Sequence, residues 1–180
     1  MCKRKETIKM KRKILAAILA ALCLMTASCG AQNDGGSAAG SPETADIQQT
    51  YDVAPSEVTA AILLEIPINS AIEKGVADLG AYFSDLDTSG ITEASYYMCA
   101  SGAYPDEIAV FRFSSAELAE SGKAAVQTRL DKQISVYESY TPDEMYKLEN
   151  AVIEVKGNYI YYLVTSDNVK AKEIAEGLIS

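Results

Sequence analysis

The stretch V-I-E-V-K-G-N-Y-I-Y-Y-L-V, residues 152–164, decides the fold. Two runs rich in β-branched and aromatic residues flank Gly157-Asn158, and a Gly-Asn pair between such runs is typical of a two-residue hairpin turn. The register that this turn predicts pairs Lys156 with Tyr159, Val155 with Ile160 and Glu154 with Tyr161.

Alternation along this hairpin separates a core face from a second face that we expect to be half-exposed. The core face carries Ile153, Val155, Ile160, Tyr162 and Val164. Because Tyr159 and Tyr161 fall on the second face, we expect them to form a candidate binding face for peptide or sugar with Tyr96 and Tyr97 of the preceding hairpin. Cross-strand tyrosine pairing on a half-covered sheet is the alternative interpretation.

The remaining pattern predicts a second hairpin and five helices. Residues 93–101 and 107–113 read as strands on either side of a turn-rich loop, with Ala109, Phe111 and Phe113 toward the core and Arg112 toward solvent. Ser114-x-x-Glu117 is a capping box that begins the longest helix, which ends before Pro142. The predicted helices cover residues 55–66, 77–83, 114–140, 141–148 and 168–179.

This order of elements favours one α+β domain over residues 47–180. We predict a two-layer sandwich in which two hairpins joined by the long helix form a four-stranded antiparallel sheet, with helices on one face. The order of the strands in the sheet, including a ferredoxin-like order, stays open.

The N-terminus has the pattern of a secretory signal. Seven basic residues before position 14 precede an apolar run over residues 14–25, which is shorter than the ~20 residues that span a membrane. The following M-T-A-S-C, residues 25–29, resembles the bacterial lipoprotein box, which implies cleavage before Cys29 and acylation of its thiol. We therefore predict a signal peptide over residues 1–28 and a lipidated Cys with a flexible tether over residues 29–46. An ordinary signal peptide or an uncleaved anchor is the alternative.

Charge and composition exclude several classes of function. Without residues 1–28 the chain keeps nine basic and 24 acidic residues, a net charge of −15, which argues against binding nucleic acid. The chain has no His, which excludes His-based catalysis and His metal ligands. Cys99 is then the only cysteine beyond Cys29, and we expect it to be a buried small apolar residue without a disulfide.

One loop carries a weak calcium signal. Asp85-x-Asp87-x-Ser89-Gly90 copies the first positions of an EF-hand loop, but Tyr96 stands at the twelfth position, where a bidentate Glu is needed. We favour a solvated turn and predict no metal, no cofactor and no catalytic residues, because no nucleophile motif or phosphate-binding loop is present.

Five short motifs remain: P-D-E-I-A-V-F at 105–111, R-L at 129–130, Y-x-x-Y-x-P at 137–142, L-E-N-A at 148–151 and K-G-N-Y at 156–159. Together they resemble an uncharacterised family of bacterial, mostly Firmicute, lipoproteins that carry a domain of unknown function. The resemblance implies a location and a fold but no activity. We expect a non-catalytic lipoprotein on the extracytoplasmic face of the cell membrane that binds an envelope protein as an accessory. A small-ligand or glycan binder using the tyrosine face is the alternative.

Overall fold

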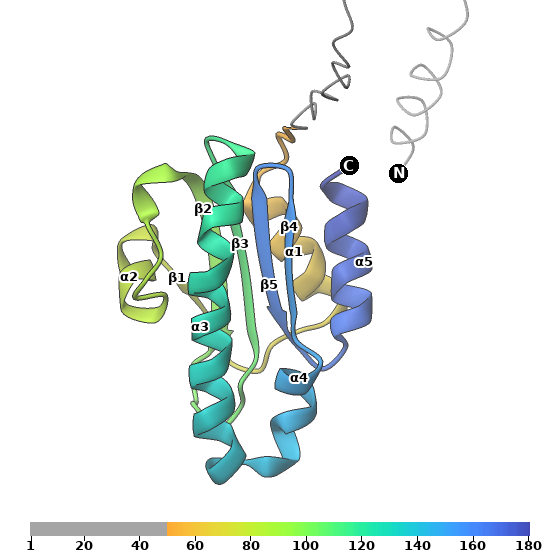
Figure 1. The fold of residues 1–180 in the computed structure, drawn as a ribbon. Coiled ribbons are helices and arrows are strands. Elements are labelled where there is room, and N and C mark those ends of the chain that lie inside the picture. Colours follow the sequence, from red (N-terminus) through yellow and green to blue (C-terminus); the bar gives the residue numbers. More distant parts are fainter. Residues whose placement is uncertain (1–49) are drawn as a thin grey trace, which may run out of the picture. The chain divides into compact units, whose positions relative to one another are not determined.

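A computed structural model describes residues 50–180, which form one five-stranded antiparallel sheet with helices packed against it (Figure 1). The predicted signal peptide, Cys29 and the tether lie outside the described residues. The strand order is β1-β2-β3-β5-β4. The strands are β1 (Ala71–Lys74), β2 (Ile91–Cys99), β3 (Glu107–Phe113), β4 (Val152–Lys156) and β5 (Tyr159–Val164). The α-helices are α1 (Pro55–Glu65), α2 (Leu79–Tyr82), α3 (Ala116–Tyr140), α4 (Met145–Glu149) and α5 (Asn168–Leu178).

The predicted α+β class and antiparallel sheet are confirmed, but the sheet has five strands instead of four. The missed strand, β1, lies at the edge of the sheet and pairs only with β2, with Ile72 opposite Met98. Its four residues alternate between exposed and half-buried, so no continuous apolar run marked it in the sequence. A short edge strand with charged residues is also a common way for a sheet to avoid pairing with another chain.

Helices cover both faces of the sheet, whereas the sequence predicted helices on one face only. On the first face, α2 and α3 pack on Phe111, Tyr162 and their neighbours, as predicted. On the second face, α1 and α5 pack on each other and on Ile108, Val110 and Tyr161 (Figure 1). The central strands β3 and β5 are buried on both faces, and such strands read as nearly continuous apolar runs instead of alternating ones.

The predicted hairpin register is confirmed at every pair. Lys156 lies opposite Tyr159, Val155 opposite Ile160 and Glu154 opposite Tyr161. Gly157 adopts φ 55°, the left-handed conformation that this turn needs and that Gly reaches without strain.

The N-cap of the long helix α3 is Ser115, one residue after the predicted Ser114, and the helix itself begins at Ala116. The Ser115 hydroxyl accepts a hydrogen bond from the backbone N–H of Leu118 at 3.4 Å. Further along, Gly122 lets the helix approach the sheet closely. A Cβ at this position would lie 3.0 Å from Ile160 Cδ1 and 3.1 Å from the Phe113 ring, so a larger residue would push α3 away.

The segment before α1 is fastened to the β4–β5 turn. The Asn158 side chain accepts from the backbone N–H of Tyr51 at 2.9 Å and donates to the carbonyl of Phe113 at 3.2 Å. The Tyr159 hydroxyl donates to the Val53 carbonyl. The first described residues therefore lie beside the β4–β5 turn, at the end of the sheet opposite to α4 (Figure 1).

Candidate functional site

The four tyrosines predicted to form a binding face do not form one. Tyr159 and Tyr161 are fully buried on the second face, under α1 and α5. Tyr96 is fully buried on the opposite face, where it meets the Phe83 ring edge to face at 5.3 Å. Tyr97 is half-buried. The prediction was wrong because it left the second face of the sheet half-exposed, and the structure covers that face with two helices.

The weak calcium candidate forms a capped turn. The Asp87 carboxylate accepts from the backbone N–H of Ser89 at 2.9 Å. The Ser89 side chain, together with this backbone contact, holds the pKa of Asp87 below its ordinary value. Among residues 50–180, no group of three or more His, Cys, Asp or Glu side chains could hold a metal ion. Asp85, Asp87 and Ser89 therefore gain no support as ligands.

Cys99 is buried, as predicted, at the end of β2. Its sulfur lies 3.2 Å from the Ser101 hydroxyl, and it is a free thiol. It is part of the apolar cluster on the second face of the sheet, where it packs as a small apolar residue.

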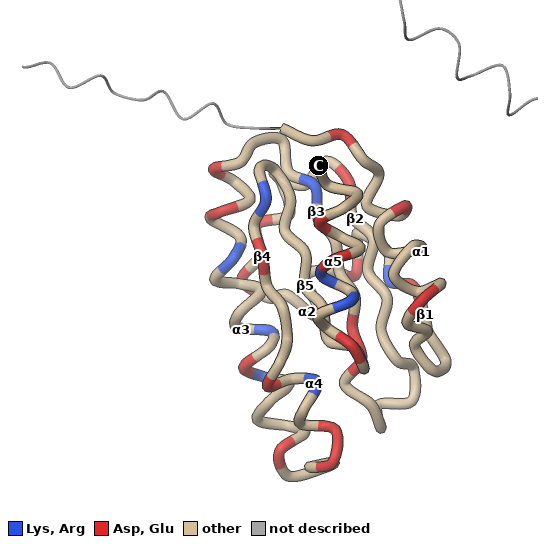
Figure 2. Tube along the Cα trace, turned by 90° about the vertical axis from the view of Figure 1, so that its right-hand side faces the viewer, with Lys and Arg blue, Asp and Glu red and all other residues tan. Residues whose placement is uncertain are grey.

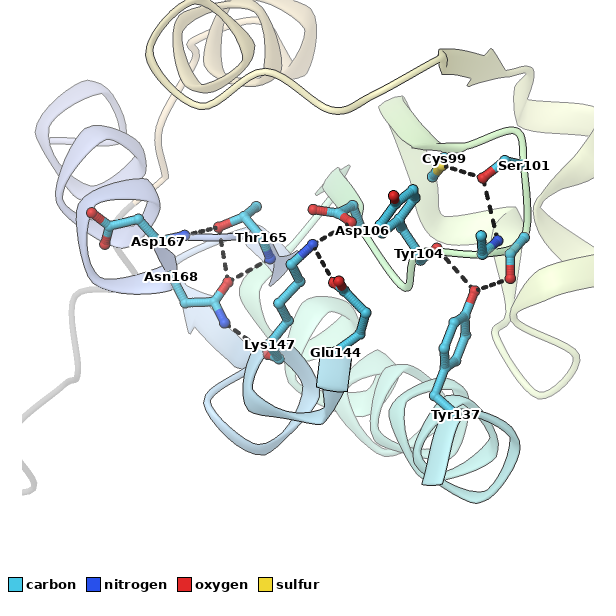
Figure 3. Close-up of polar contacts among 12 residues, drawn as sticks. Cys99, Ser101, Tyr104, Asp106, Tyr137, Glu144, Lys147, Thr165, Asp167 and Asn168 are labelled. Atoms are coloured by element: carbon cyan, nitrogen blue, oxygen red, sulfur yellow. Dashed lines mark hydrogen bonds and ion pairs between the residues drawn. The ribbon is translucent and has the colours of Figure 1, made fainter. Parts of the chain in front are cut away.

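The most concentrated polar chemistry lies at the end of the sheet near α4, around Lys147 (Figure 3). The Lys147 ammonium lies 2.8 Å from a carboxylate oxygen of Asp106 and 2.7 Å from one of Glu144. Burial opposes the charged form of Lys147, but hydrogen bonds to both carboxylates outweigh it and raise the pKa of the ammonium. Lys147 therefore stays protonated at neutral pH and is not available as a nucleophile.

Asn168, the first residue of α5, ties this end of the sheet to α4. Its side-chain oxygen accepts from the N–H and the hydroxyl of Thr165, at 2.7 and 3.0 Å. Its side-chain nitrogen donates to the carbonyls of Lys147 and Asn150, at 2.8 and 2.9 Å. One buried amide thus satisfies two groups of Thr165, the residue after β5, and the carbonyls of Lys147 in α4 and of Asn150, its C-cap, which fixes α4 against the end of the sheet.

Tyr137 fastens the loop between β2 and β3 to the last turns of α3 (Figure 3). Its hydroxyl lies 3.0 Å from the carbonyl oxygen of Gly102 and 2.9 Å from that of Tyr104, and shares its proton between them. Gly102 has φ 63°, so a β-carbon there would strain the loop at the point where Tyr137 holds it.

A second buried ion pair lies next to the first along the chain. Glu107 is buried under α3 and forms a two-point contact with the Arg129 guanidinium, with Arg129 Nε donating at 3.2 Å. Gln133 donates to the same carboxylate at 2.7 Å. Burial raises the pKa of the Glu107 carboxyl, against the opposing effect of Arg129. Both of these buried carboxylates, Asp106 and Glu107, hold a cation, and neither is left as a free general base.

Four large side chains are exposed around this framework, and we call them the tyrosine end: Tyr104, Val136, Tyr140 and Tyr146. Their exposed fractions are 39%, 56%, 68% and 48%. The Lys147 ammonium lies 5.4 Å from the centre of the Tyr104 ring and 5.8 Å from that of Tyr146. Two of the three rings are therefore positioned by the same buried cation that joins Asp106 and Glu144.

The sequence did not single out this site, because its parts are far apart in the chain. Asp106 and Lys147 are separated by 41 positions, and either residue alone looks like an ordinary surface charge. A signal was nevertheless present, because the motifs behind the family resemblance include Asp106, Glu107, Arg129 and Tyr137.

The fold and this site define a small α+β domain in which buried ion pairs support an exposed aromatic surface. A family described as Domain of unknown function (DUF4358) matches residues 68–165, and the chain belongs to this family. No curated protein and no solved structure matches the chain. The matched residues include the whole sheet and α2 to α4, whereas α1 and α5, which cover the second face, lie outside them.

The predicted membership of a domain-of-unknown-function family is thus confirmed. The family description names no activity, ligand or location. Within residues 50–180, no helix is both long enough and apolar enough to cross a membrane.

Proposed function

We propose that this protein is a lipoprotein of a bacterial, Firmicute-type envelope, anchored through Cys29 on the extracytoplasmic face of the cell membrane. There it acts as a non-catalytic accessory that binds a protein partner through the tyrosine end. The order of basic, apolar and small residues before Cys29 supports the anchor. Two acyl chains on this residue would hold the protein on a bilayer without any membrane-binding face on the domain.

The tyrosine end is the observation that carries the binding proposal. Three tyrosines and a valine stay exposed there although large apolar surface is costly to leave in water. Tyrosine is enriched at protein interfaces because it offers a large, stiff contact surface and a polar hydroxyl. The buried contacts of Lys147 and Tyr137 hold the loop, α3 and α4 in place, so little conformational freedom would be lost on binding.

The way the chain enters the domain supports the same proposal. Residues 51–53 are fastened to the β4–β5 turn, at the end of the sheet remote from α4 (Figure 1). The described part of the chain thus begins at the end of the sheet opposite to the tyrosine end. A partner bound at Tyr140 and Tyr146 would contact the end of the domain remote from residue 50.

The buried ion pairs support a non-catalytic role. Lys147 is held by two carboxylates, and Glu107 is held by Arg129 and Gln133. Groups held in this way rigidify a structure, whereas a general base or a nucleophile needs access to a substrate. The glycan-binding alternative loses its surface, because Tyr159, Tyr161 and Tyr96 are buried.

The proposal is tested by crosslinking the full-length protein in its native cells, followed by affinity capture and mass spectrometry. We expect one stoichiometric partner that is lost in Y140S/Y146S. The matched control is L64S/V169S, which removes two exposed apolar side chains from α1 and α5. Loss of the partner in both variants, or no partner above background in the wild type, would contradict the proposal.

The anchor is tested separately by cell fractionation. We expect the wild-type protein in the membrane fraction and C29S outside it. A C29S protein that remains fully membrane-bound would refute lipid anchoring at this residue.

A further inference from the structure

The tyrosine end is strongly acidic. The segments that build it, residues 100–107 and 133–150, contain six acidic residues and one basic residue, Lys147. Lys147 is buried and already paired with Asp106 and Glu144. The exposed acids of this end have no ion-pair partner among residues 50–180; they are Glu138, Asp143 and Glu149. Figure 2 shows acidic positions on the loop below α4.

Elsewhere among residues 50–180, five acidic side chains pair with neighbouring cations, whereas others, such as Glu57 and Glu120, are exposed and have no ion-pair partner there. Arg112 pairs with Asp52 and Glu93 near the β4–β5 turn. The lysines of α5 pair with acids of other elements, Lys170 with Glu65 at 2.7 Å and Lys172 with Glu154 at 3.0 Å. What distinguishes the tyrosine end is that the exposed aromatic side chains of residues 50–180, Tyr104, Tyr140 and Tyr146, lie there together with unpaired acidic residues.

Exposed tyrosine rings beside carboxylates form a surface that attracts cations. A ring face attracts an ammonium or a guanidinium, and a nearby carboxylate pairs with the same group. The domain already uses this chemistry at this end, because the Lys147 ammonium lies within 6 Å of two ring centres and in contact with two carboxylates. Phosphate groups of nucleic acids or lipids would be repelled here.

Building on the proposed function, we propose that the tyrosine end binds a basic segment of its protein partner. Lysine or arginine side chains of that segment stack on Tyr140 and Tyr146 and pair with Glu138, Asp143 and Glu149. The proposal specifies the chemistry of the partner, an exposed Lys/Arg-containing stretch of protein.

The test measures binding of fluorescein-labelled octa-arginine to the full-length mature protein in non-ionic detergent, by fluorescence anisotropy. An octapeptide of alternating Gly and Ser is the neutral reference. The first variant, E138Q/D143N/E149Q, removes three charges from the tyrosine end. Its matched control, E57Q/E120Q/E173Q, removes three charges from exposed positions on α1, α3 and α5, so the two proteins have equal net charge.

We expect E138Q/D143N/E149Q to weaken binding roughly tenfold, as three exposed ion pairs would predict, and the control to weaken it less than about twofold. Y140S/Y146S leaves the charge unchanged and should weaken binding about fivefold through loss of two cation–π contacts. Far-UV circular dichroism confirms that each variant is folded.

Equal losses in the two charge variants would overturn the inference, because binding would then follow net charge alone. Binding of the Gly-Ser peptide as tightly as octa-arginine would overturn it as well. These failures are distinguishable from failure of the proposed function. If Y140S/Y146S still loses its crosslinked partner, the docking surface stands and only the basic chemistry of the partner is wrong.

Discussion

Replacing Lys147 with methionine tests whether the buried ion pairs hold the tyrosine end together. Methionine keeps most of the length and apolar character of the lysine stem but removes the ammonium. Asp106 and Glu144 then lose the cation that lies within 2.8 Å of each. Asp106 would then remain buried, and Glu144 half-buried, without a counter-charge.

The size of the effect follows from the burial of the pair. The side chains of Lys147 and Asp106 are 8% and 11% exposed, whereas that of Glu144 is 22% exposed and better able to reach water. Removing one partner of a buried pair costs about 3–5 kcal/mol, and the exposure of Glu144 favours the lower value, about 3 kcal/mol. For a domain of this size, that loss lowers the melting temperature by roughly 10 °C.

Urea unfolding followed by far-UV circular dichroism measures this loss. The double variant K147M/D106N should recover about half of it, because one of the two unpaired charges is gone. A loss below about 1 kcal/mol for K147M would refute the reasoning, since it would mean that water reaches the pair and screens it.

Three further predictions concern other buried groups. In urea unfolding, N158A should lower the free energy of unfolding by about 2 kcal/mol, because it leaves backbone groups of Tyr51 and Phe113 unpaired. A decrease below about 0.5 kcal/mol, the smallest contribution expected of one hydrogen bond, would refute this. Y162F should leave the free energy of unfolding unchanged within about 1 kcal/mol, because no hydrogen bond of ordinary geometry reaches its buried hydroxyl among the described residues, although Glu107 lies near enough to contribute to the raised pKa of Tyr162; a larger loss on urea unfolding would refute that assignment. The raised pKa of Glu107 means that the folded state holds its proton more tightly than the unfolded chain. Stability of the wild type relative to E107Q should therefore fall as the pH rises above about 4.5, and urea titrations from about pH 4.5 to 7.5 that show the opposite slope would contradict it.

Local chemistry was enough to predict the β4–β5 hairpin. Gly157 and Asn158 fix a two-residue turn, and the turn fixes every cross-strand pair that follows. The same is true of α3, whose apolar stripe and N-terminal serines predicted its course, with an error of one residue at its N-cap.

The covering of the second face could not be derived from strand alternation alone. In β5, residues of both parities are apolar or aromatic, so the pattern fits a strand with two buried faces as well as one with a half-exposed face. Whether the second face of β5 is buried or half-exposed depends on where α1 and α5 pack, which is a long-range property. The error placed Tyr159 and Tyr161 on a surface when they are in the core.

The candidate site was beyond prediction for a related reason. Its exposed residues come from a loop, the end of a long helix and a short helix, and their proximity depends on Lys147 and Tyr137 reaching across the fold. Asp106 and Glu107 are adjacent in sequence but bind different cations, on α4 and on α3. Two adjacent acidic residues in an acidic chain do not indicate that each will pair with a cation on a different helix.

Site-specific photo-crosslinking in living cells tests the central claim most directly. A photoreactive phenylalanine analogue replaces Tyr104, Tyr140 or Tyr146, one at a time, in the full-length protein, and replaces Leu64 or Val169 as references on other faces. The account predicts that all three positions of the tyrosine end crosslink to the same protein and that the two reference positions do not. The same crosslinks from all five positions, or crosslinks from the reference positions alone, would contradict it.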